Sequence, residues 1–524
     1  MKVYSSELFY LIKSLTKSEK IYFRKYCKAF VPNGLKGYML LFDYVNKLKI
    51  YDESVVQQHF KNSEVGKHLS VKKNYLQGVI YKALNSYYAG LSNEIQVRNL
   101  LNLADILHYK NLKKQSDYCL QRASKISARY DMDTYSMEIE KIEISKAILF
   151  RDLKKISQLQ TQTNQQHYQR HLNSLEKSFK VRLIMLQIIF DFQQSGKLFK
   201  HSHRYEEYEN ILKPALKEIV SPGEKTFCLQ ALSLLYQNTG RHAEAVKTRE
   251  EQLRIFTSNP DLKHVFPARY LACLNDISQQ YKQLYRYKEC LHAVKLCLAE
   301  IEQLPFGRSK YFQLNYKLHS YQILLDLYQT AGLYVQALNL INTIETMIKK
   351  NASEVSAEFR LVLNLQFASV NFVAGNYSNC QRYIHAIFND NTKVRKDVHV
   401  SASILNVLCQ FEQNEYDYQN YLVHYYSKKY KSRSPRYSFY PKVINSIGKA
   451  LNGIVTNKRK DKNHLHTLVN IFMEVESDPS KNHILQGFDF ISWVESKIKN
   501  DMLSNVIQTK NKRLVSVLKE IDLK

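Results

Sequence analysis

The chain has 524 residues, of which 44% are hydrophobic, and carries a formal net charge of +28 at neutral pH. That length exceeds what one hydrophobic core normally supports, so we expect several domains or a repeat array in which each unit packs on its neighbours. Glycine (14) and proline (9) are scarce, which disfavours a fold rich in tight hairpins and favours long helices joined by short turns.

Positive charge is concentrated in two regions of the chain. Residues 1–90 carry 15 Lys and Arg against 6 Asp and Glu, and residues 418–460 carry 10 Lys and Arg with no Asp or Glu. Residues 461–524 have equal numbers of basic and acidic side chains. Basic regions of this kind attract anions such as nucleic acid, anionic lipid or an acidic protein.

The cysteines and the apolar segments indicate the compartment. The eight cysteines form no CxxC pair, which is typical of reduced thiols in a reducing compartment. The N-terminal stretch MKVYSSELFYLIKSL lacks the pattern of a signal peptide. The most apolar segment, 181–192, is too short to span a bilayer and contains Arg182 and Asp191. We therefore expect a cytoplasmic protein with no membrane span and no cofactor.

The first element expected in chain order is a helix that begins at Lys17. Thr16 and Glu19 form a capping-box pattern immediately around this position. The apolar stripe of the helix would consist of Phe23, Tyr26, Cys27 and Phe30. Further on, apolar residues recur at helical spacing in SVKKNYLQGVIYKALNSYY, which predicts a second helix after Ser70. Residues 1–90 are therefore predicted to be a helical cap.

A helix-turn-helix DNA-binding motif is an alternative interpretation of the same region. Its helices would be a segment near 53–60 and the helix after Ser70, and its reading groups would be Lys72, Lys73, Asn74 and Gln77. The intervening segment KNSEVGKHLS is longer than the short turn of that motif. We therefore favour a cap that covers the exposed end of a repeat array.

An internal repeat occupies the middle of the chain, across 229–384. Four segments share a pattern of four positions in the same order. The first position is an aromatic or polar residue, the second is Gly or a substitute, the third is an aromatic residue or His, and the fourth is a small residue. The sets are Tyr236, Gly240, His242, Ala245; Tyr281, Tyr285, Tyr287, Cys290; Tyr328, Gly332, Tyr334, Ala337; and Asn371, Gly375, Tyr377, Cys380. A Gly that adopts the left-handed conformation ends one helix, and the small residue lets the next helix approach closely. Each pair leaves an apolar face uncovered, so the pairs must stack.

These segments resemble tetratricopeptide repeats, whose pattern runs Leu-Gly, Tyr, Gly, Tyr, Ala. The early Trp is absent, the closing Pro is mostly missing, and the period exceeds the usual 34 residues. The resemblance implies a degenerate tetratricopeptide-like array over 91–425, with weaker echoes at Asn111 and Asn414. It also implies a right-handed superhelix.

The ends of the chain carry a second resemblance. The stretches ELFYLIKSLTKSEKIYFRKY, NYLQGVIYKAL and FISWVESKI resemble a family of uncharacterised bacterial helical-repeat proteins, which implies an entirely helical chain. We therefore predict an all-α fold, an α-solenoid of stacked antiparallel helix pairs with helical caps at both ends. Its parts would be 1–90, 91–425 and 426–524, the last a basic linker and a C-terminal cap anchored by Trp493.

No catalytic or metal-binding constellation stands out, so we expect neither a catalytic nor a metal site. The chain contains no phosphate-binding loop, no dinucleotide-binding glycine motif and no nucleophile elbow. His167 and His171 have the spacing of half a zinc site, but no third ligand is evident. Cys290 and Cys380 occupy the small-residue position of the repeat, where we interpret them as packing residues rather than redox thiols.

The most unusual stretch is HYYSKKYKSRSPRYSFYPK at 424–442. Its basic residues are candidates for binding a polyanion, and they are Lys428, Lys429, Lys431, Arg433 and Arg436. They alternate with the tyrosines Tyr425, Tyr426, Tyr430, Tyr437 and Tyr440, whose rings could stack on bases. The alternative is a helix that runs into a solvated loop, with the tyrosines packed on the last repeat.

Two hypotheses for function follow. The first is a non-enzymatic interaction scaffold that binds a peptide or protein in the groove of the array. The second is a nucleic-acid-binding or regulatory protein that uses the basic N-terminal region and residues 418–460.

Overall fold

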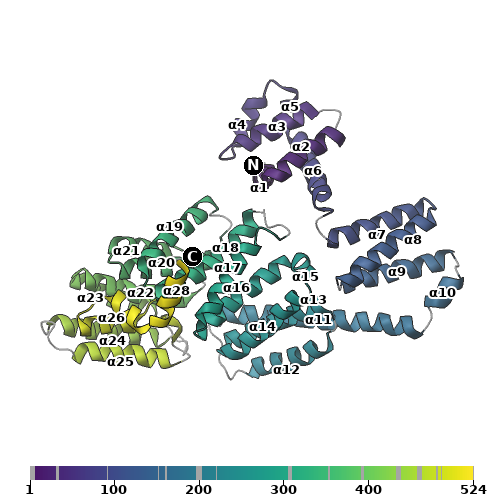
Figure 1. Cartoon of the computed structure of the whole chain (residues 1–524). Coiled ribbons are helices and arrows are strands. Elements are labelled where there is room, and N and C mark those ends of the chain that lie inside the picture. The colour runs from purple at the N-terminus through teal and green to yellow at the C-terminus, as the bar shows by residue number, and fades with distance from the viewer. Residues whose placement is uncertain are drawn as a thin grey trace.

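The computed structural model describes residues 6–30, 35–90, 93–130, 132–150, 153–159, 162–195, 203–219, 221–304, 310–351, 355–390, 395–431, 438–456, 463–478, 482–485 and 487–522. All the secondary structure in these residues is helical, and successive helices pack as antiparallel pairs (Figure 1). The predicted all-α solenoid is therefore confirmed.

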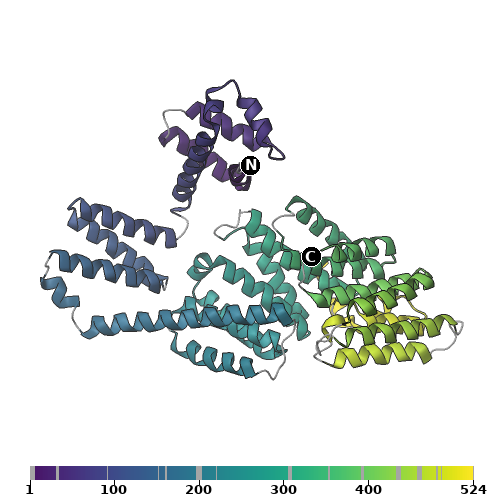
Figure 2. The same cartoon turned by 180° about the vertical axis from the view of Figure 1, so that it is seen from behind.

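The N-terminal helices form a lobe that stands apart from the array in two opposite views (Figures 1 and 2). Its helices are α1 (Glu7–Ser14), α2 (Lys17–Phe30), α3 (Leu35–Lys47), α4 (Glu53–Phe60), α5 (Glu64–Lys67) and α6 (Leu69–Tyr88). Among the described residues, the buried core of the lobe is drawn from residues 8–83 alone and includes Ile12, Phe42 and Ile80.

Helix α2 begins at Lys17, as predicted from its capping box. The Thr16 amide donates to Glu19 Oε2 at 2.6 Å, and the Glu19 amide donates to Thr16 Oγ1 at 3.2 Å. Phe23 and Cys27 are each only 2% exposed, but Phe30, at the last position of the helix, is 69% exposed. The predicted apolar stripe is therefore wrong at Phe30, because none of the described helices covers the end of α2.

One turn geometry recurs in six helix pairs of the described chain. The pairs are α7 (Asn93–Tyr109) with α8 (Lys113–Arg129), α13 (Pro222–Asn238) with α14 (His242–Ser258), α16 (Pro267–Gln283) with α17 (Tyr287–Glu300), α18 (Lys310–Thr330) with α19 (Tyr334–Lys350), α20 (Ala357–Val373) with α21 (Tyr377–Phe388), and α22 (Lys396–Glu412) with α23 (Tyr416–Lys429). The short helix α15 (Asp261–Val265) precedes α16.

In each turn one residue has a left-handed backbone. The φ angles are 59° at Asn111, 73° at Gly240, 56° at Tyr285, 70° at Gly332, 73° at Gly375 and 61° at Asn414. The amide that follows donates to the carbonyl five residues earlier, at 2.8 to 3.0 Å, which caps the first helix of the pair. The same local chemistry therefore sets the geometry of all six turns.

The residues of the repeat pattern lie in the contacts within and between pairs. Ala245, Cys290, Ala337 and Cys380 are fully buried, and Ser116 occupies the corresponding position of the α7–α8 pair. Tyr236, Tyr281, Tyr287 and Tyr334 are buried, whereas Tyr328 and Tyr377 are partly buried against the core. All eight cysteines are free and buried, and burial raises the pKa of the Cys290 thiol to about 12. The Cys290 thiol is therefore protonated at neutral pH and packs as a small apolar group.

Four helices between α8 and α13 depart from this pattern. They are α9 (Asp133–Phe150), α10 (Leu153–Leu159), α11 (Gln162–Ser195) and α12 (His203–Glu218). The long helix α11 extends from beside α10 to the helix pairs that begin at α13 (Figure 2). There its residues Val181 and Ile188 share a buried core with Leu232 of α13.

The C-terminal residues extend the stack and then turn back over it. Helices α24 (Tyr440–Thr456) and α25 (Asn463–Ser477) add to the array beyond α23. The chain then returns through η1 (Asn482–Leu485), α26 (Phe490–Lys499), α27 (Leu503–Lys510) and α28 (Lys512–Asp522). Leu514 and Leu518 of α28 join a buried core with Leu291 of α17, so the end of the chain lies over the middle of the array (Figure 1).

Trp493 is the anchor of this return. It is 1% exposed, and its indole Nε1 donates to Glu412 Oε1 at 2.7 Å. The side chain of Lys497 also contacts Glu412. The predicted anchoring residue thus fastens the returning segment to the end of α22.

Candidate functional site

Two adjoining cavities lie where the first helices of successive pairs meet the returning C-terminal segment. Their volumes are about 600 and 460 Å³, and Lys282, Asp326 and Gly487 line both. The smaller cavity takes side chains from α13, α16, α18, α20 and α22, which are the first helices of five consecutive pairs. We call the two cavities together the inner groove.

A segment of the chain itself lies along the inner groove. Gln329 Nε2 donates to the Gly487 carbonyl at 2.6 Å, and Ser401 Oγ donates to the Ile484 carbonyl at 2.5 Å. Gly487 has a φ of +97°, and a Cβ there would lie 3.1 Å from the Leu365 side chain. Side-chain donors of the array therefore hold two main-chain carbonyls of the returning segment. Glycine is favoured at position 487 because the backbone is left-handed there and a Cβ would crowd Leu365.

The smaller cavity is lined by two buried amide groups with unused hydrogen-bonding atoms. Asn238 is 4% exposed and Gln366 is 7% exposed, and neither Asn238 Nδ2 nor Gln366 Oε1 has a hydrogen-bond partner. Gln329 lines the larger cavity, and its Oε1 is likewise buried without a hydrogen-bond partner. Leaving such an atom unpaired costs about 1–3 kcal/mol, so a ligand that reaches these atoms would gain free energy by satisfying them.

The formal charges of the smaller cavity are largely paired within the protein. Lys282 forms an ion pair with Asp326, and Arg395 forms one with Asp397 at 2.7 Å. His242 Nδ1 lies 2.9 Å from Gln280 Oε1. The cavity therefore offers hydrogen-bonding amides rather than a strong field of either sign.

These amide residues were not predicted from the sequence. A signal for them was present, because amides recur just before the turns in YQNTG, QQYKQLY and YQTAG. That recurrence places Gln237 and Asn238, Gln280, and Gln329 at the ends of the first helices, where they line the inner groove.

The structure describes only some of the basic residues that were predicted to bind a polyanion. Lys428 and Lys429 are exposed at the end of α23, and Lys431 is exposed just beyond it. Arg433 and Arg436 lie outside the described residues. Lys429 Nζ lies 4.8 Å from the centre of the Phe388 ring, and burial lowers the pKa of this amine.

The tyrosines of this stretch are not equivalent. Tyr426 and Tyr440 are only 3% and 2% exposed, and the partly buried Tyr430 donates to the His399 carbonyl at 3.1 Å. Tyr425 is 45% exposed, and Tyr437 lies outside the described residues. The prediction that these tyrosines act together as a stacking surface is therefore wrong for Tyr426 and Tyr440, because the core of the array covers them.

Several basic residues of the N-terminal lobe are engaged within the lobe. Lys73 pairs with Glu53, and the Lys72 side chain donates to the Glu64 carbonyl. Arg24 pairs with Asp43 at 2.5 Å. A further helix, α5, lies between α4 and α6, so these helices are not joined by the short turn of a helix-turn-helix.

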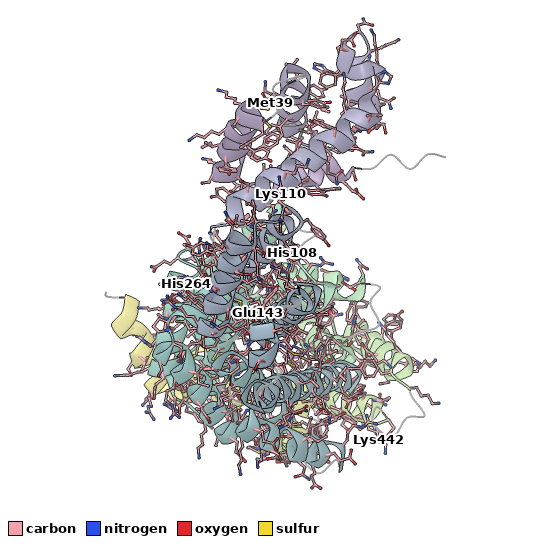
Figure 3. The ribbon with its side chains drawn as sticks, turned by 90° about the vertical axis from the view of Figure 1, so that its right-hand side faces the viewer. Met39, His108, Lys110, Glu143, His264 and Lys442 are labelled. Atoms are coloured by element: carbon pink, nitrogen blue, oxygen red, sulfur yellow. The ribbon has the colours of Figure 1, made fainter. Side chains whose placement is uncertain are left out.

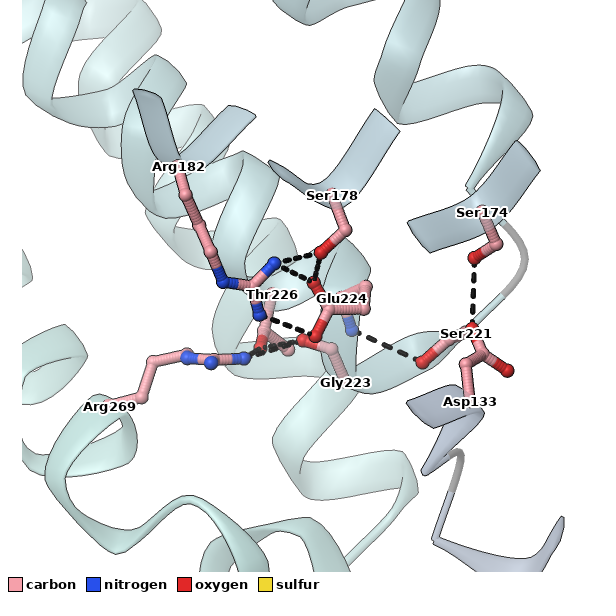
Figure 4. A network of polar contacts seen from close by, with 9 residues as sticks. All are labelled: Asp133, Ser174, Ser178, Arg182, Ser221, Gly223, Glu224, Thr226 and Arg269. Carbon is pink, nitrogen blue, oxygen red and sulfur yellow. Dashed lines mark hydrogen bonds and ion pairs between the residues drawn. The ribbon is translucent and has the colours of Figure 1, made fainter. Parts of the chain in front are cut away.

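A polar network holds α11 against the array (Figure 4). Arg182 makes two bonds of 2.9 Å to the two carboxylate oxygens of Glu224, and Arg269 donates to the Gly223 carbonyl at 2.7 Å and to Thr226. Burial lowers the pKa of Arg269 to about 10. Both guanidinium groups have partners within the protein, so we interpret the network as structural.

The histidine pairs assemble no metal site in the part of the chain that the structure describes. His171 Nδ1 lies 2.9 Å from Asp133 Oδ1, and the side chain of His167 lies outside the described residues. No group of three or more potential ligands occurs among the described residues. No helix within the described ranges has the length and apolar character needed to cross a bilayer.

Comparisons with known proteins identify no relative of this chain. No family model matches the chain, and no curated protein or solved structure matches it significantly. The function must therefore be inferred from the geometry of the molecule.

Proposed function

We propose that the protein is a non-enzymatic interaction scaffold that binds an extended peptide segment of another protein in the inner groove. The observation that carries this proposal is the pair of unpartnered amide atoms, Asn238 Nδ2 and Gln366 Oε1, at the smaller cavity. One is a donor and the other an acceptor. A peptide group carries one acceptor and one donor, so an extended chain matches both.

The way the groove holds its own chain supports the same class of ligand. At the boundary of the two cavities, Gln329 and Ser401 recognise main-chain carbonyls rather than side chains. Amide and hydroxyl side chains that bind main chain accept many sequences, because every residue except proline presents the same groups. Specificity would then come from the apolar residues beside them, such as Val362 and Leu365.

The test is selection from a displayed peptide library against the full chain. We expect the enriched peptides to bind the purified protein, and we expect Asn238→Leu and Gln366→Met each to weaken that binding by roughly 2- to 12-fold, which corresponds to one hydrogen bond of about 0.5–1.5 kcal/mol. The measurement is isothermal titration of the selected peptides. Both substitutions remove a buried unpaired atom, so neither is expected to destabilise the free protein through a lost bond.

The matched control is Gln57→Met in the N-terminal lobe, an exposed glutamine far along the chain from the inner groove. It should leave peptide affinity unchanged. The proposal fails if no peptide is enriched, or if the enriched peptides bind Asn238→Leu and Gln366→Met as tightly as they bind the original chain.

A further inference from the structure

Helix α23 exposes three tyrosines in a row on one face. Tyr418, Tyr421 and Tyr425 are 48%, 59% and 45% exposed. Their rings are nearly parallel, with interplanar angles of 11° and 14° and centroid separations of 5.9 and 6.2 Å. The same helix places Leu422 and Tyr426 in the core, so its packing is complete without the three exposed rings.

Positive charge lies at the C-terminal end of this row. Lys428, Lys429 and Lys431 are exposed, and Lys429 Nζ lies 5.8 Å from the centre of the Tyr425 ring. Acidic side chains are absent from the sequence over the whole of 418–460, so nothing on α23 beyond Tyr418 neutralises these lysines.

The neighbouring helix adds to the same positive region. Helix α24 packs against α23, where Ser427 Oγ donates to Asn445 Oδ1 at 2.6 Å. It carries the exposed residues Lys442 and Lys449, and Figure 3 shows Lys442 at the outer surface of the molecule. From Tyr418 to the end of α24, these two adjacent helices therefore carry lysines and no carboxylates.

We propose that Tyr418, Tyr421, Tyr425, Lys428, Lys429 and Lys431 form a site for single-stranded nucleic acid, which we call the tyrosine–lysine face. Unpaired bases stack on exposed aromatic rings without regard to sequence, and lysines neutralise the phosphates between them. The combination selects this ligand: an acidic protein or a lipid headgroup would engage the lysines but would give no role to three parallel rings.

The charges also orient the ligand along α23. Glu415 and Asp417 are exposed at the N-terminal end of the helix, next to Tyr418, and the lysines lie at the opposite end. Phosphates are therefore drawn towards Lys428–Lys431 and repelled from Asp417. This site is separate from the inner groove and does not rest on the function proposed for the groove.

The experiment measures binding of fluorescent oligothymidylate and oligouridylate, each about 20 nucleotides long, to the full chain by anisotropy. We expect both to bind, with affinity that falls steeply between about 50 and 200 mM salt. Tyr421→Ala should weaken binding on the order of tenfold, whereas Tyr421→Phe should preserve it because the ring remains. Lys428→Glu combined with Lys431→Glu should abolish it.

Two further variants sharpen the test. Tyr118→Ala removes a 60% exposed tyrosine from α8, where Arg122 lies 5.9 Å from its ring, and it should leave the affinity unchanged. Asp417→Asn removes the repelling charge and should strengthen binding a few-fold at low salt.

Three outcomes would overturn the inference. The first is the absence of binding at low salt. The second is binding that the lysine variant abolishes but Tyr421→Ala leaves intact, which would mean a general polyanion surface without base stacking. The third is stronger binding to vesicles of anionic lipid than to either oligonucleotide, with the same loss in the lysine variant.

Discussion

At the scale of single residues, the tyrosine of the repeat does more than fill space. Tyr236 donates to Glu209 at 3.0 Å, Arg241 donates to the same carboxylate at 2.6 Å, and the guanidinium lies 4.4 Å from the centre of the Tyr236 ring. The next pair repeats the arrangement with Tyr281, Arg286 and Glu250. The arginine directly after the left-handed residue therefore ties a repeat to a carboxylate of an earlier helix in both places.

This arrangement makes a prediction about acid stability. Burial acts to raise the pKa of Glu209, but hydrogen bonds from Arg241, Lys213 and Tyr236 outweigh it and lower the pKa to about 2. The folded pKa lies below the unfolded value of about 4.3, so the stabilisation is present above pH 4.3 and is lost as the pH falls towards 2. We expect Glu209→Gln to lower the free energy of unfolding by about 1–2 kcal/mol at neutral pH, after allowance for solvent screening, and by nearly nothing at about pH 2.

Urea unfolding of the original chain and of Glu209→Gln at pH values from 7 to 2, followed by circular dichroism, measures the difference in their free energies of unfolding. The matched variant is Glu207→Gln on the same helix, α12, which should show a smaller difference at neutral pH because Glu207 is exposed and solvent screens its charge. A loss from Glu209→Gln that stays constant over the pH range would contradict the assigned role.

At the scale of elements, the left-handed turn is the unit that repeats. Glycine occupies it at Gly240, Gly332 and Gly375, whereas Tyr285 occupies it with a φ of 56° despite its side chain. The hydrogen bond that closes the turn is the same in each case. A side chain is therefore tolerated at the left-handed position of a turn when no other part of the protein lies close to it. One turn differs, because the returning C-terminal segment packs directly against its left-handed residue.

Gly332 is that residue, and Gly240 is its matched control. An added Cβ at Gly332 would lie 3.0 Å from the Ser504 carbonyl oxygen, whereas one at Gly240 would meet nothing within 4 Å. We expect Gly240→Ala to lower the free energy of unfolding by about 1–2 kcal/mol, the cost of a left-handed backbone alone. Gly332→Ala should cost at least about 1 kcal/mol more, because α27 must move away. Urea denaturation of the two variants checks this, and equal losses would count against close packing of α27 on this turn.

At the scale of the whole molecule, the chain contains one tryptophan, and it lies in the returning segment. Trp493 is buried against α22, while the N-terminal lobe has its own core and no tryptophan. Tryptophan fluorescence therefore reports on the C-terminal half of the array, and circular dichroism reports on every helix.

We expect these two signals to give different unfolding transitions. Residues 1–90 should fold as a separate fragment with helical circular dichroism and a cooperative urea transition, because their core takes no side chain from the rest of the chain. In the full chain, the dichroism curve should then contain a phase that the fluorescence curve lacks. Coincident curves, together with an unfolded 1–90 fragment, would show that the lobe depends on the array.

The sequence alone was enough for features that depend on neighbouring residues. The helix start at Lys17 follows from side chains three residues apart, and the ends of the first helices follow from a residue that tolerates a left-handed backbone. Hydrophobic periodicity likewise predicted the all-α solenoid, because each amphipathic helix must bury one face against a partner. These features need no knowledge of which partner that is.

Only the tertiary structure decided what lies in the groove and which tyrosines reach solvent. The bond from Gln329 to Gly487 joins residues 158 positions apart, and that from Gln508 to Gly332 joins residues 176 apart. No local pattern encodes such pairings. In the same way, Tyr425 and Tyr426 are adjacent in sequence, but one is exposed and the other is in the core. The reason is that hydrophobic periodicity predicts that one face of a helix is buried. Which element packs against that face depends on how distant parts of the chain come together.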